Sequence, residues 1–185
     1  MSFSLKYGIK GGVLLKKAVF LDRDGVINDN SRPVNHYSQF HFIEGALDGI
    51  KQLAEKGYEI FVVTNQGGVG LGYMKKKALD EIHHHMVNIV KENGGQITEV
   101  KACTHRPNMG CHCRKPEPGM ILELGEKHHI NLKKSYMIGD FYTDILAGMK
   151  AGVKTIYIGK EDLRGKAPQP DYFARSLLDA IKSVE

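Results

Sequence analysis

Short apolar runs alternate along this chain with segments whose apolar residues recur at helical spacing. The runs predict five strands, at residues 18–21, 60–64, 99–102, 136–138 and 155–158. Strands and helices that alternate in this way are typical of βαβ units, in which the strands are parallel and buried on both faces of the sheet. The pattern therefore predicts an α/β fold with a mainly parallel sheet.

Helical periodicity fills the intervals between the runs and follows the last of them. It predicts helices at residues 45–55, 75–92, 119–128, 144–151 and 176–184. The second helix is the clearest, because two glycines follow it and its apolar positions form one stripe. That stripe consists of Leu79, Ile82, Met86, Ile89 and Val90. Helices that connect parallel strands cover both faces of the sheet, so we expect a Rossmann-like three-layer sandwich.

Two segments do not fit the alternation. Residues 26–43 are polar and contain Pro33, and they predict a long loop without regular structure, which is usually functional. Residues 1–16 show no clear pattern and are expected to form a loose extension, followed by one domain at residues 17–185. A chain of 185 residues has no room for a large cap domain, so loops must complete any binding site.

Composition and charge narrow the class of protein. With 42% hydrophobic and 25% charged residues, the chain resembles soluble globular proteins rather than disordered ones. It has no apolar run of the ~18 residues that a membrane span needs and no signal-peptide pattern, so we expect a cytoplasmic protein without membrane contact. The net charge of +5 suits a small phosphorylated metabolite and is too small to require nucleic acid. We expect a monomer.

Side chains suited to phosphate chemistry follow the first two predicted strands. FLDRDG places Asp22 and Asp24 after the first strand, on the same side of an extended chain. One carboxylate can attack while the other transfers protons. IFVVT ends in Thr64, which Asn65 follows, and a hydroxyl and an amide can bind phosphoryl oxygens. Taken alone, each of these motifs also occurs in solvated turns.

Two later motifs add a lysine and further carboxylates. Lys115 lies in CRKPEPG just before a predicted helix, and MIGDFYTD places Asp140 and Asp144 beyond the fourth strand. Isolated lysines and acids are usually exposed. Because parallel strands end at the same edge of a sheet, however, the four motifs are expected to converge where α/β sheets bind ligands.

The three cysteines of the chain lie close together in a C-x-H-x5-C-x-C motif. Three thiolates and one imidazole fill the tetrahedral shell of a structural zinc ion, and the candidates are Cys103, His105, Cys111 and Cys113. The alternative is a set of reduced surface thiols beside an unrelated histidine. We favour zinc, because the motif uses every cysteine and nothing else would order the segment. The zinc-bound loop directly precedes the lysine of CRKPEPG, so it is expected to fix the approach of that lysine to a substrate.

Together these motifs resemble the haloacid dehalogenase superfamily, whose phosphatases carry DxD, a Thr or Ser after the second strand, a Lys and a late GDxxxD. The resemblance spans residues 17 to about 159. Within the superfamily, FLDRDGVIN, VVTNQ, CxH followed by CxCRKP, and PGM are similar to one branch. That branch holds D-glycero-D-manno-heptose 1,7-bisphosphate 7-phosphatases and histidinol-phosphate phosphatases. The resemblance implies a Mg²⁺-dependent phosphomonoesterase that acts on the heptose bisphosphate or, alternatively, on histidinol phosphate or another small sugar monophosphate.

The resemblance also implies catalytic roles. Asp22 is the nucleophile that forms an aspartyl-phosphate, and Asp24 protonates the leaving alkoxide and later deprotonates water. Asp24 must be protonated before the first step, and the nearby phosphoryl anion is expected to raise its pKa. Thr64 and Lys115 hold the transferring oxygens.

A catalytic Mg²⁺ ion is implied by the same resemblance. Asp22, the backbone carbonyl of Asp24, and Asp140 are its expected ligands, and oxygen donors suit this ion. Asp144 lies one helical turn beyond Asp140. It is expected to orient Lys115 or a metal-bound water rather than to bind the metal directly.

Substrate binding is expected to involve Asn65 and Arg114, and here the chain departs from the branch. We expect the branch to carry one basic residue in the loop after TNQ and another just after the GD of the fourth strand. This chain has Leu71 and Phe141 at those positions. A second phosphate without those cations loses charge-assisted hydrogen bonds worth roughly 1.5 to 3 kcal/mol each, so we expect better use of monophosphates than is usual in the branch.

The remaining histidines are weaker candidates. His83, His84 and His85 are consecutive on a predicted helix and cannot share one face, so we expect exposed side chains. His36 and His41 lie in the long loop near the expected site. A substrate contact is the less favoured alternative for these two residues.

Two other functional classes are compatible with parts of the sequence. A zinc-stabilised nucleic-acid-binding module would need basic residues interleaved with exposed aromatic residues, whereas acids cluster at the expected sheet edge. A phosphotransfer receiver would use one acceptor aspartate and would not need Asp24. We therefore favour the phosphatase.

Overall fold

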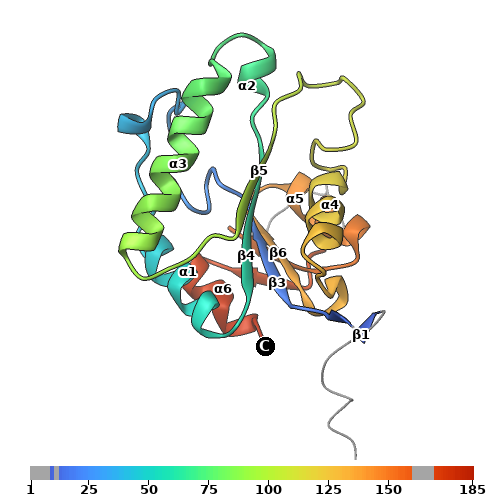
Figure 1. Cartoon of the computed structure of the whole chain (residues 1–185). Helices are drawn as coiled ribbons and strands as arrows, with labels where there is room; N and C mark the ends of the chain where they lie inside the picture. The colour runs from blue at the N-terminus through green and yellow to red at the C-terminus, as the bar shows by residue number, and fades with distance from the viewer. Residues whose placement is uncertain (1–8, 11–12, 160–168) are drawn as a thin grey trace, which may run out of the picture.

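A six-stranded parallel sheet forms the centre of the fold (Figure 1). The computed structural model describes residues 9–10, 13–159 and 169–185. From one edge of the sheet to the other, the strands are β5 (Glu99–Cys103), β4 (Glu59–Asn65), β3 (Ala18–Leu21), β6 (Tyr136–Gly139), β7 (Lys154–Ile158) and β8 (Tyr172–Ala174). Every residue of β3 and β6 is buried, so both faces of the sheet are covered at its centre.

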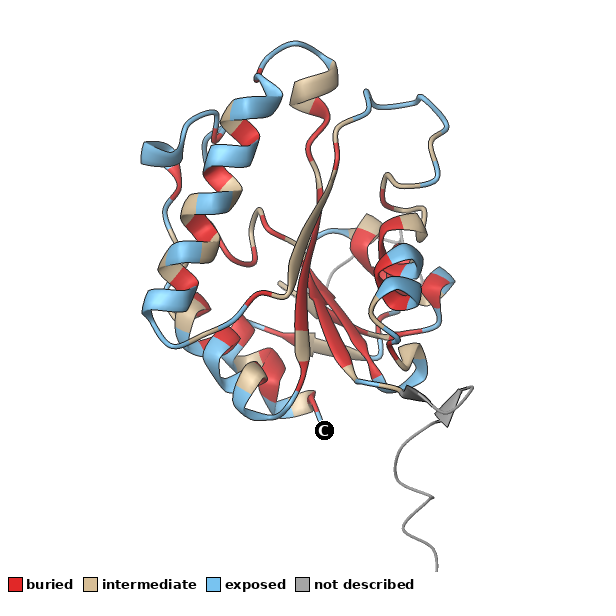
Figure 2. Cartoon of the chain, viewed as in Figure 1, coloured by how far each residue is buried: buried red, intermediate tan, exposed pale blue. Residues whose placement is uncertain are grey.

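Helices cover the two faces of the sheet and complete three layers (Figure 1). One face carries α1 (Ala46–Glu55), α3 (Lys76–Glu92) and the short α6 (Leu177–Ala180), and the other carries α4 (Gly119–Lys127) and α5 (Tyr142–Ala151). The buried residues of these helices lie on their sheet-facing sides, whereas the exposed residues face outward (Figure 2). The predicted α/β sandwich is therefore confirmed.

Chain order creates a crevice next to β3. The following strand, β4, pairs with one edge of β3, whereas β6 pairs with the other. At such a topological switch point, the connections leave two neighbouring strands in opposite directions, and open α/β sheets bind ligands there. The two strand ends are Leu21 and Gly139, which directly precede Asp22 and Asp140.

The structure differs from the prediction mainly in short elements. β8 and the helix α2 (Gly67–Gly70) were not predicted, because three or four residues are too few to show a period. The helix predicted at residues 176–184 is divided into α6 and a 3-10 turn at Ile181–Ser183. The five predicted strands are all present, within one or two residues of the predicted ends.

The segment at residues 26–43 is the long loop that we predicted, but the expectation that it is polar throughout is wrong, because the loop is anchored to the core. It contains a 3-10 turn at Tyr37–Gln39. Four of its side chains are buried in the main hydrophobic cluster, namely Val26, Ile27, Val34 and Phe40. Their irregular spacing fits neither a helix nor a strand, which is why the sequence pattern did not reveal them.

The predicted loose extension at residues 1–16 is described only in part. β1 (Ile9–Lys10) and β2 (Val13–Leu14) form an antiparallel pair, and the rest of the extension before residue 13 lies outside the described residues. Lys16 is joined to the domain by backbone hydrogen bonds with His129 and Asn131. This end of the segment is therefore attached.

Two larger features are missing from the described part of the chain. The segments between β3 and α1 and between β5 and α4 are loops with no more than one 3-10 turn, and they hold no separate cap domain. None of the helices described is both long enough and apolar enough to cross a membrane.

Candidate active site

A cavity of about 570 Å³ lies at the carboxyl ends of β3 and β6. All the residues predicted to act on phosphate line it: Asp22, Asp24, Thr64, Asn65, Arg114, Lys115, Asp140 and Asp144. They come from four segments that are far apart in the sequence. The fold thus brings together the motifs that the sequence predicted would converge.

Lys115 is buried between two carboxylates of this cavity. Its Nζ lies 2.8 Å from Oδ1 of Asp22 and 2.6 Å from Oδ1 of Asp144. Burial opposes the charge of the ammonium group, but the two carboxylates outweigh burial and raise the pKa of Lys115. The other oxygen of Asp144 accepts a hydrogen bond from the backbone amide of Phe141 at 3.1 Å. Asp144 is therefore held by contacts within the protein and orients Lys115.

Carboxylates crowd the same sheet edge and repel one another. Ligand oxygens of Asp22, Asp140 and Asp144 lie within 4.8 Å of one another, and we call these three residues the carboxylate cluster. Burial raises the pKa of Asp22 to about 7, against the opposing charge of Lys115. Burial and the charge of Asp22 raise the pKa of Asp140 to about 6. A divalent cation would relieve this repulsion, so Asp22 and Asp140, with the backbone carbonyl of Asp24, could hold Mg²⁺.

Gly25 allows the backbone after β3 to pass close to Asp140. Its φ of +85° is rarely adopted by residues with a side chain, and a Cβ at this position would lie 1.9 Å from Oδ2 of Asp140. The same oxygen accepts a hydrogen bond from Nδ2 of Asn30 at 3.4 Å. A glycine is thus required here for the aspartates of two strands to approach each other.

Three neighbouring side chains engage both oxygens of Asp24. Nε and Nη2 of Arg23 donate to the carboxylate at 2.8 to 3.2 Å. Asn28 donates to Oδ1 at 3.0 Å and Gln66 donates to Oδ2 at 2.7 Å. Burial favours the neutral acid, but the charge of Arg23 and these hydrogen bonds outweigh burial and lower the pKa of Asp24. Without a substrate, Asp24 is a carboxylate, so its role as an acid depends on the approach of the phosphoryl anion.

The end of β4 contributes Thr64 and Asn65. Oγ1 of Thr64 accepts a hydrogen bond from Nε2 of Gln66 at 2.8 Å. The amide of Asn65, which we predicted to bind phosphoryl oxygens, is engaged with the backbone of Lys115 instead. It donates to the carbonyl at 2.9 Å and accepts from the amide at 3.0 Å. Asn65 therefore positions Lys115.

His83 and His85 are half-buried on α3, so our expectation of exposed side chains is wrong for these two members of the histidine triplet. Nε2 of His83 lies 3.2 Å from Nη1 of Arg23, a residue that is only 2% exposed. His83 follows Leu79 by four positions and precedes Met86 by three, so its place on the apolar stripe of α3 could have revealed its burial. The contact with Arg23 could not be predicted, because 60 positions separate the two residues.

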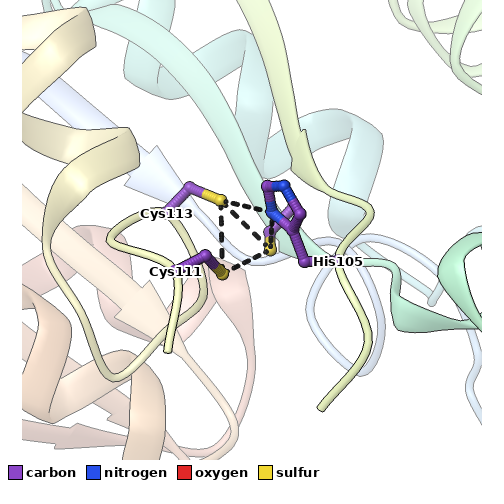
Figure 3. Close-up of side chains that lie close together, drawn as sticks. His105, Cys111 and Cys113 are labelled. Atoms are coloured by element: carbon purple, nitrogen blue, oxygen red, sulfur yellow. Dashed lines mark hydrogen bonds between the residues drawn. The ribbon is translucent and has the colours of Figure 1, made fainter. Parts of the chain in front are cut away.

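The predicted zinc ligands converge beside the cavity (Figure 3). The sulfurs of Cys103, Cys111 and Cys113 are 3.2 to 3.7 Å apart, and Nδ1 of His105 lies 3.1 Å from the sulfur of Cys113. In tetrahedral zinc sites with Zn–S bonds of about 2.3 Å, sulfurs are about 3.8 Å apart, so these four atoms could hold the ion with little movement. We call residues 103–113 the Cys/His loop.

The Cys/His loop forms part of the cavity wall. Residues 107–110 and Cys111 line the cavity, and the chain continues from Cys113 into Arg114 and Lys115. Nη1 of Arg114 is buried and has no hydrogen-bond partner among the described residues. A Cβ added to Gly67, which does not line the cavity, would lie 3.1 Å from this nitrogen, so Nη1 faces that glycine. Arg114 itself lines the cavity, where a guanidinium can bind an anion.

Two exposed apolar side chains lie at the cavity. Met109 and Phe141 line the cavity and are 60% and 57% exposed. Phe141 thus occupies one of the two positions where we expected the branch to carry a cation. Leu71, at the other position, is not among the described residues that line the cavity, and neither are His36 and His41.

Most of the chain is similar in sequence to known phosphatases. A protein-family model described as HAD-hydrolase-like matches residues 112–180. The D-glycero-beta-D-manno-heptose-1,7-bisphosphate 7-phosphatase of Helicobacter pylori (strain J99) is 37% identical over 143 residues, which are 77% of this chain and 82% of that protein. The enzyme of the same name from Pasteurella multocida is 32% identical over 180 residues, which are 92% of this chain and 98% of that protein. A relative from Photorhabdus laumondii, 36% identical over 78% of this chain and 82% of its own length, is named for the alpha anomer.

Solved structures show the same likeness. The crystal structure of D,D-heptose 1,7-bisphosphate phosphatase from B. bronchiseptica, complexed with magnesium and phosphate, has a TM-score of 0.84 and 28% identity. The match covers 90% of this chain and 97% of that chain. The D,D-heptose 1,7-bisphosphate phosphatase from Burkholderia thailandensis has a TM-score of 0.70 and 26% identity, with 91% of this chain and 97% of that chain covered.

Proposed function

The chain belongs to the phosphatases of the haloacid dehalogenase superfamily, and from this premise we propose that it is a Mg²⁺-dependent heptose bisphosphate 7-phosphatase. The main observation behind this proposal is the position of Asp22. It lines the cavity, its carboxylate forms an ion pair with Lys115, and it lies close to Asp140. The choice of substrate is supported by relatives of similar length that are named for this activity. It is also supported by the volume of the cavity, which can hold a sugar with two phosphates.

In the first step, a carboxylate oxygen of Asp22 attacks the phosphorus of the 7-phosphate, and the bond from phosphorus to the sugar oxygen breaks. The departing alkoxide takes a proton from Asp24. Lys115 and the hydroxyl of Thr64 bind the transferring oxygens, which carry most of the charge. The products are an aspartyl-phosphate and heptose 1-phosphate.

In the second step, water attacks the phosphorus of the aspartyl-phosphate. Asp24, now a carboxylate, takes a proton from this water, and the bond between phosphorus and Asp22 breaks. Inorganic phosphate leaves, and Asp22 returns to its carboxylate form. The hydrogen bonds from Arg23, Asn28 and Gln66 favour the carboxylate form of Asp24, which suits this step.

The carboxylate cluster is the proposed site of Mg²⁺, held by Asp22, Asp140 and the backbone carbonyl of Asp24. Bound Mg²⁺ would offset the charge of the carboxylates and of the transferring phosphoryl group. The raised pKa values of Asp22 and Asp140 support this placement, because these acids lack a sufficient counter-charge within the protein. Asp144 is assigned to Lys115, since both of its oxygens have partners in the protein.

The Cys/His loop is the proposed site of structural Zn²⁺, with Cys103, His105, Cys111 and Cys113 as ligands. Four protein ligands complete a tetrahedral shell and leave no position for a substrate. The loop ends one residue before Arg114, so the ion would fix the direction in which the chain enters the active site.

Arg114 is the cation that we assign to the second phosphate of the substrate, because it lines the cavity and a guanidinium can bind phosphate. Phe141 faces the same cavity without a charge. With Phe141 in place of a second cation, the cavity offers less charge to a second phosphate. This favours a second candidate function, the hydrolysis of histidinol phosphate or a small sugar monophosphate. The relatives are named for both anomers, so both are substrates to be compared.

A substrate panel tests the proposed function. Phosphate release would be measured with purified protein and Mg²⁺ on both anomers of D-glycero-D-manno-heptose 1,7-bisphosphate, on histidinol phosphate and on sugar monophosphates. We expect the highest kcat/KM with one heptose bisphosphate and no turnover by Asp22→Asn. A higher kcat/KM with histidinol phosphate would support the second candidate instead. A cytoplasmic location, a monomeric state and the lack of nucleic-acid binding remain predictions.

A further inference from the structure

His83 connects helix α3 to the active site through a buried arginine. Its Nε2 lies 3.2 Å from Nη1 of Arg23, and no other residue of the consecutive histidines makes a contact of this kind among those described. Burial, reinforced by the charge of Arg23, lowers the pKa of His83 to about 4. The imidazole is therefore neutral near neutral pH, and its Nε2 can accept a hydrogen bond from the guanidinium.

The guanidinium of Arg23 is held at two of its edges. Nη2 lies 2.8 and 3.0 Å from the two oxygens of Asp24, and Nε lies 3.2 Å from Oδ1. Nη1 points to His83. Because a guanidinium is planar and rigid, an acceptor on Nη1 fixes the direction in which the other nitrogens point.

We propose that His83 is a positioning residue of the active site, which holds Arg23 in the orientation that keeps the carboxylate of Asp24 in the cavity. The inference rests on the proposed function, in which Asp24 is the acid and base. Asn28 and Gln66 also donate to Asp24, but the side chain of each bonds to only one of its oxygens. Among the described residues, Arg23 is the one whose side chain bonds to both oxygens of Asp24, and His83 contacts this guanidinium.

Loss of the imidazole would leave Nη1 of Arg23 without an acceptor in a place that is 2% exposed. A buried donor without a partner is costly, so the guanidinium would turn toward another acceptor and release its two-point contact with Asp24. A displaced Asp24 transfers protons poorly. Phosphoryl binding by Thr64 and Lys115, which do not touch Arg23, would persist.

Two substrates that differ in their leaving groups separate this role from a purely structural one. The leaving group of the heptose bisphosphate is a sugar alkoxide, which needs the proton of Asp24. The leaving group of p-nitrophenyl phosphate is a stable phenolate, which needs none. We expect His83→Leu to lower kcat/KM about tenfold for heptose 1,7-bisphosphate and less than about twofold for p-nitrophenyl phosphate. A structural defect would lower both values alike.

Conservative and control variants complete the experiment. His83→Gln keeps an acceptor at the same reach and should restore kcat/KM for the bisphosphate to within about threefold of wild type. His84→Leu, at an exposed position on the same helix, should change neither substrate. Should His83→Leu fail to fold, His83→Asn, whose shorter amide does not reach Arg23, takes its place and is expected to behave as His83→Leu.

The outcomes distinguish the two claims. An equal loss with both substrates, or an unchanged kcat/KM for the bisphosphate in His83→Leu, overturns the role of His83 and leaves the proposed function intact. Failure of the wild type to hydrolyse either substrate with Mg²⁺ overturns both claims.

Discussion

The carboxylate cluster and the Cys/His loop are both groups of potential metal ligands, yet they differ in donor type and in openness. The first offers hard oxygen atoms, lines the cavity and includes a buried contact with Lys115. The second offers soft sulfur atoms and one imidazole, which together fill a tetrahedron. A dense set of metal ligands therefore does not by itself indicate a catalytic centre. Chemistry also needs an open position for the substrate beside it.

The two clusters are also linked along the chain. Lys115 follows Cys113 by two residues, and its backbone is bonded to the side chain of Asn65. The Cys/His loop and the end of β4 therefore both position Lys115, whose ammonium group contacts Asp22. We therefore expect the Cys/His loop to support the carboxylate cluster without taking part in the chemistry.

Removal of the nucleophile should produce the largest loss of activity. It should affect the carboxylate cluster and leave the Cys/His loop unchanged. We expect Asp22→Asn to lower kcat/KM by roughly four orders of magnitude, because the aspartyl-phosphate cannot form. Zinc content and fold should be unchanged. Phosphate release and elemental analysis check both points, with the exposed Asp48→Asn on α1 as the matched control. An active Asp22→Asn protein would exclude the covalent mechanism.

Loss of a ligand from the Cys/His loop should lower activity less than Asp22→Asn does, and should lower stability more. Cys113→Ser is expected to lose bound zinc, to melt at a lower temperature, and to lower kcat/KM about 10- to 100-fold through displacement of Lys115. The readouts are elemental analysis, thermal melting and phosphate release. His112→Ala, an exposed position between two ligands, is the control and should keep all three values. Zinc-free protein with full activity, prepared under reducing conditions, would show that the loop needs no ion.

Much of this comparison could be predicted from the sequence, because each cluster lies in a short motif. Asp22 and Asp140 follow strands whose apolar runs are clear, and the cysteines occupy a closely spaced pattern. Contacts between distant segments could not be predicted. The burial of Arg23 against His83 and the bonds from Asn65 to Lys115 depend on how helices and strands pack, which local periodicity does not specify.

A cation at position 141 should have a moderate effect on the choice between a bisphosphate and a monophosphate substrate. Phe141→Lys is expected to raise the preference for heptose bisphosphate over its monophosphate about tenfold, since one charge-assisted hydrogen bond is worth roughly 1.5 kcal/mol or more. Leu71→Arg, at a position outside the described cavity lining, is the control and should leave the preference unchanged. The measurement is the ratio of kcat/KM values for the two substrates. An unchanged ratio in Phe141→Lys would mean that this position does not influence selectivity.

The smallest expected effect concerns stability and pH. Asp22 and Asp140, with pKa values of about 7 and about 6, bind more protons in the folded state than in the unfolded state. In Mg²⁺-free buffer, the contribution of these two acids to the free energy of unfolding should therefore fall as the pH rises from about 4 to about 7, whereas the lowered pKa of His83 contributes in the opposite direction between about pH 4 and 6.5. Mg²⁺ replaces these protons, so it should raise the melting temperature by roughly 4 °C at about pH 8 and by less at about pH 5.

Thermal melting with and without Mg²⁺, in the absence of chelators that would also remove zinc, measures this increment. Asp140→Asn removes one proposed ligand and should abolish it. An equal increment at both pH values would place the Mg²⁺ site away from these acids.

The most direct test of chemistry at the carboxylate cluster is the intact mass of Asp24→Asn after incubation with Mg²⁺ and p-nitrophenyl phosphate, whose phenolate leaves without a proton from Asp24. Without the base, hydrolysis of the intermediate should be slower than its formation, so the account predicts a protein heavier by one phosphoryl group. Fragmentation should place that group on Asp22. A phosphoryl group on any residue other than Asp22, or product released with no phosphoprotein at any time, would contradict the account.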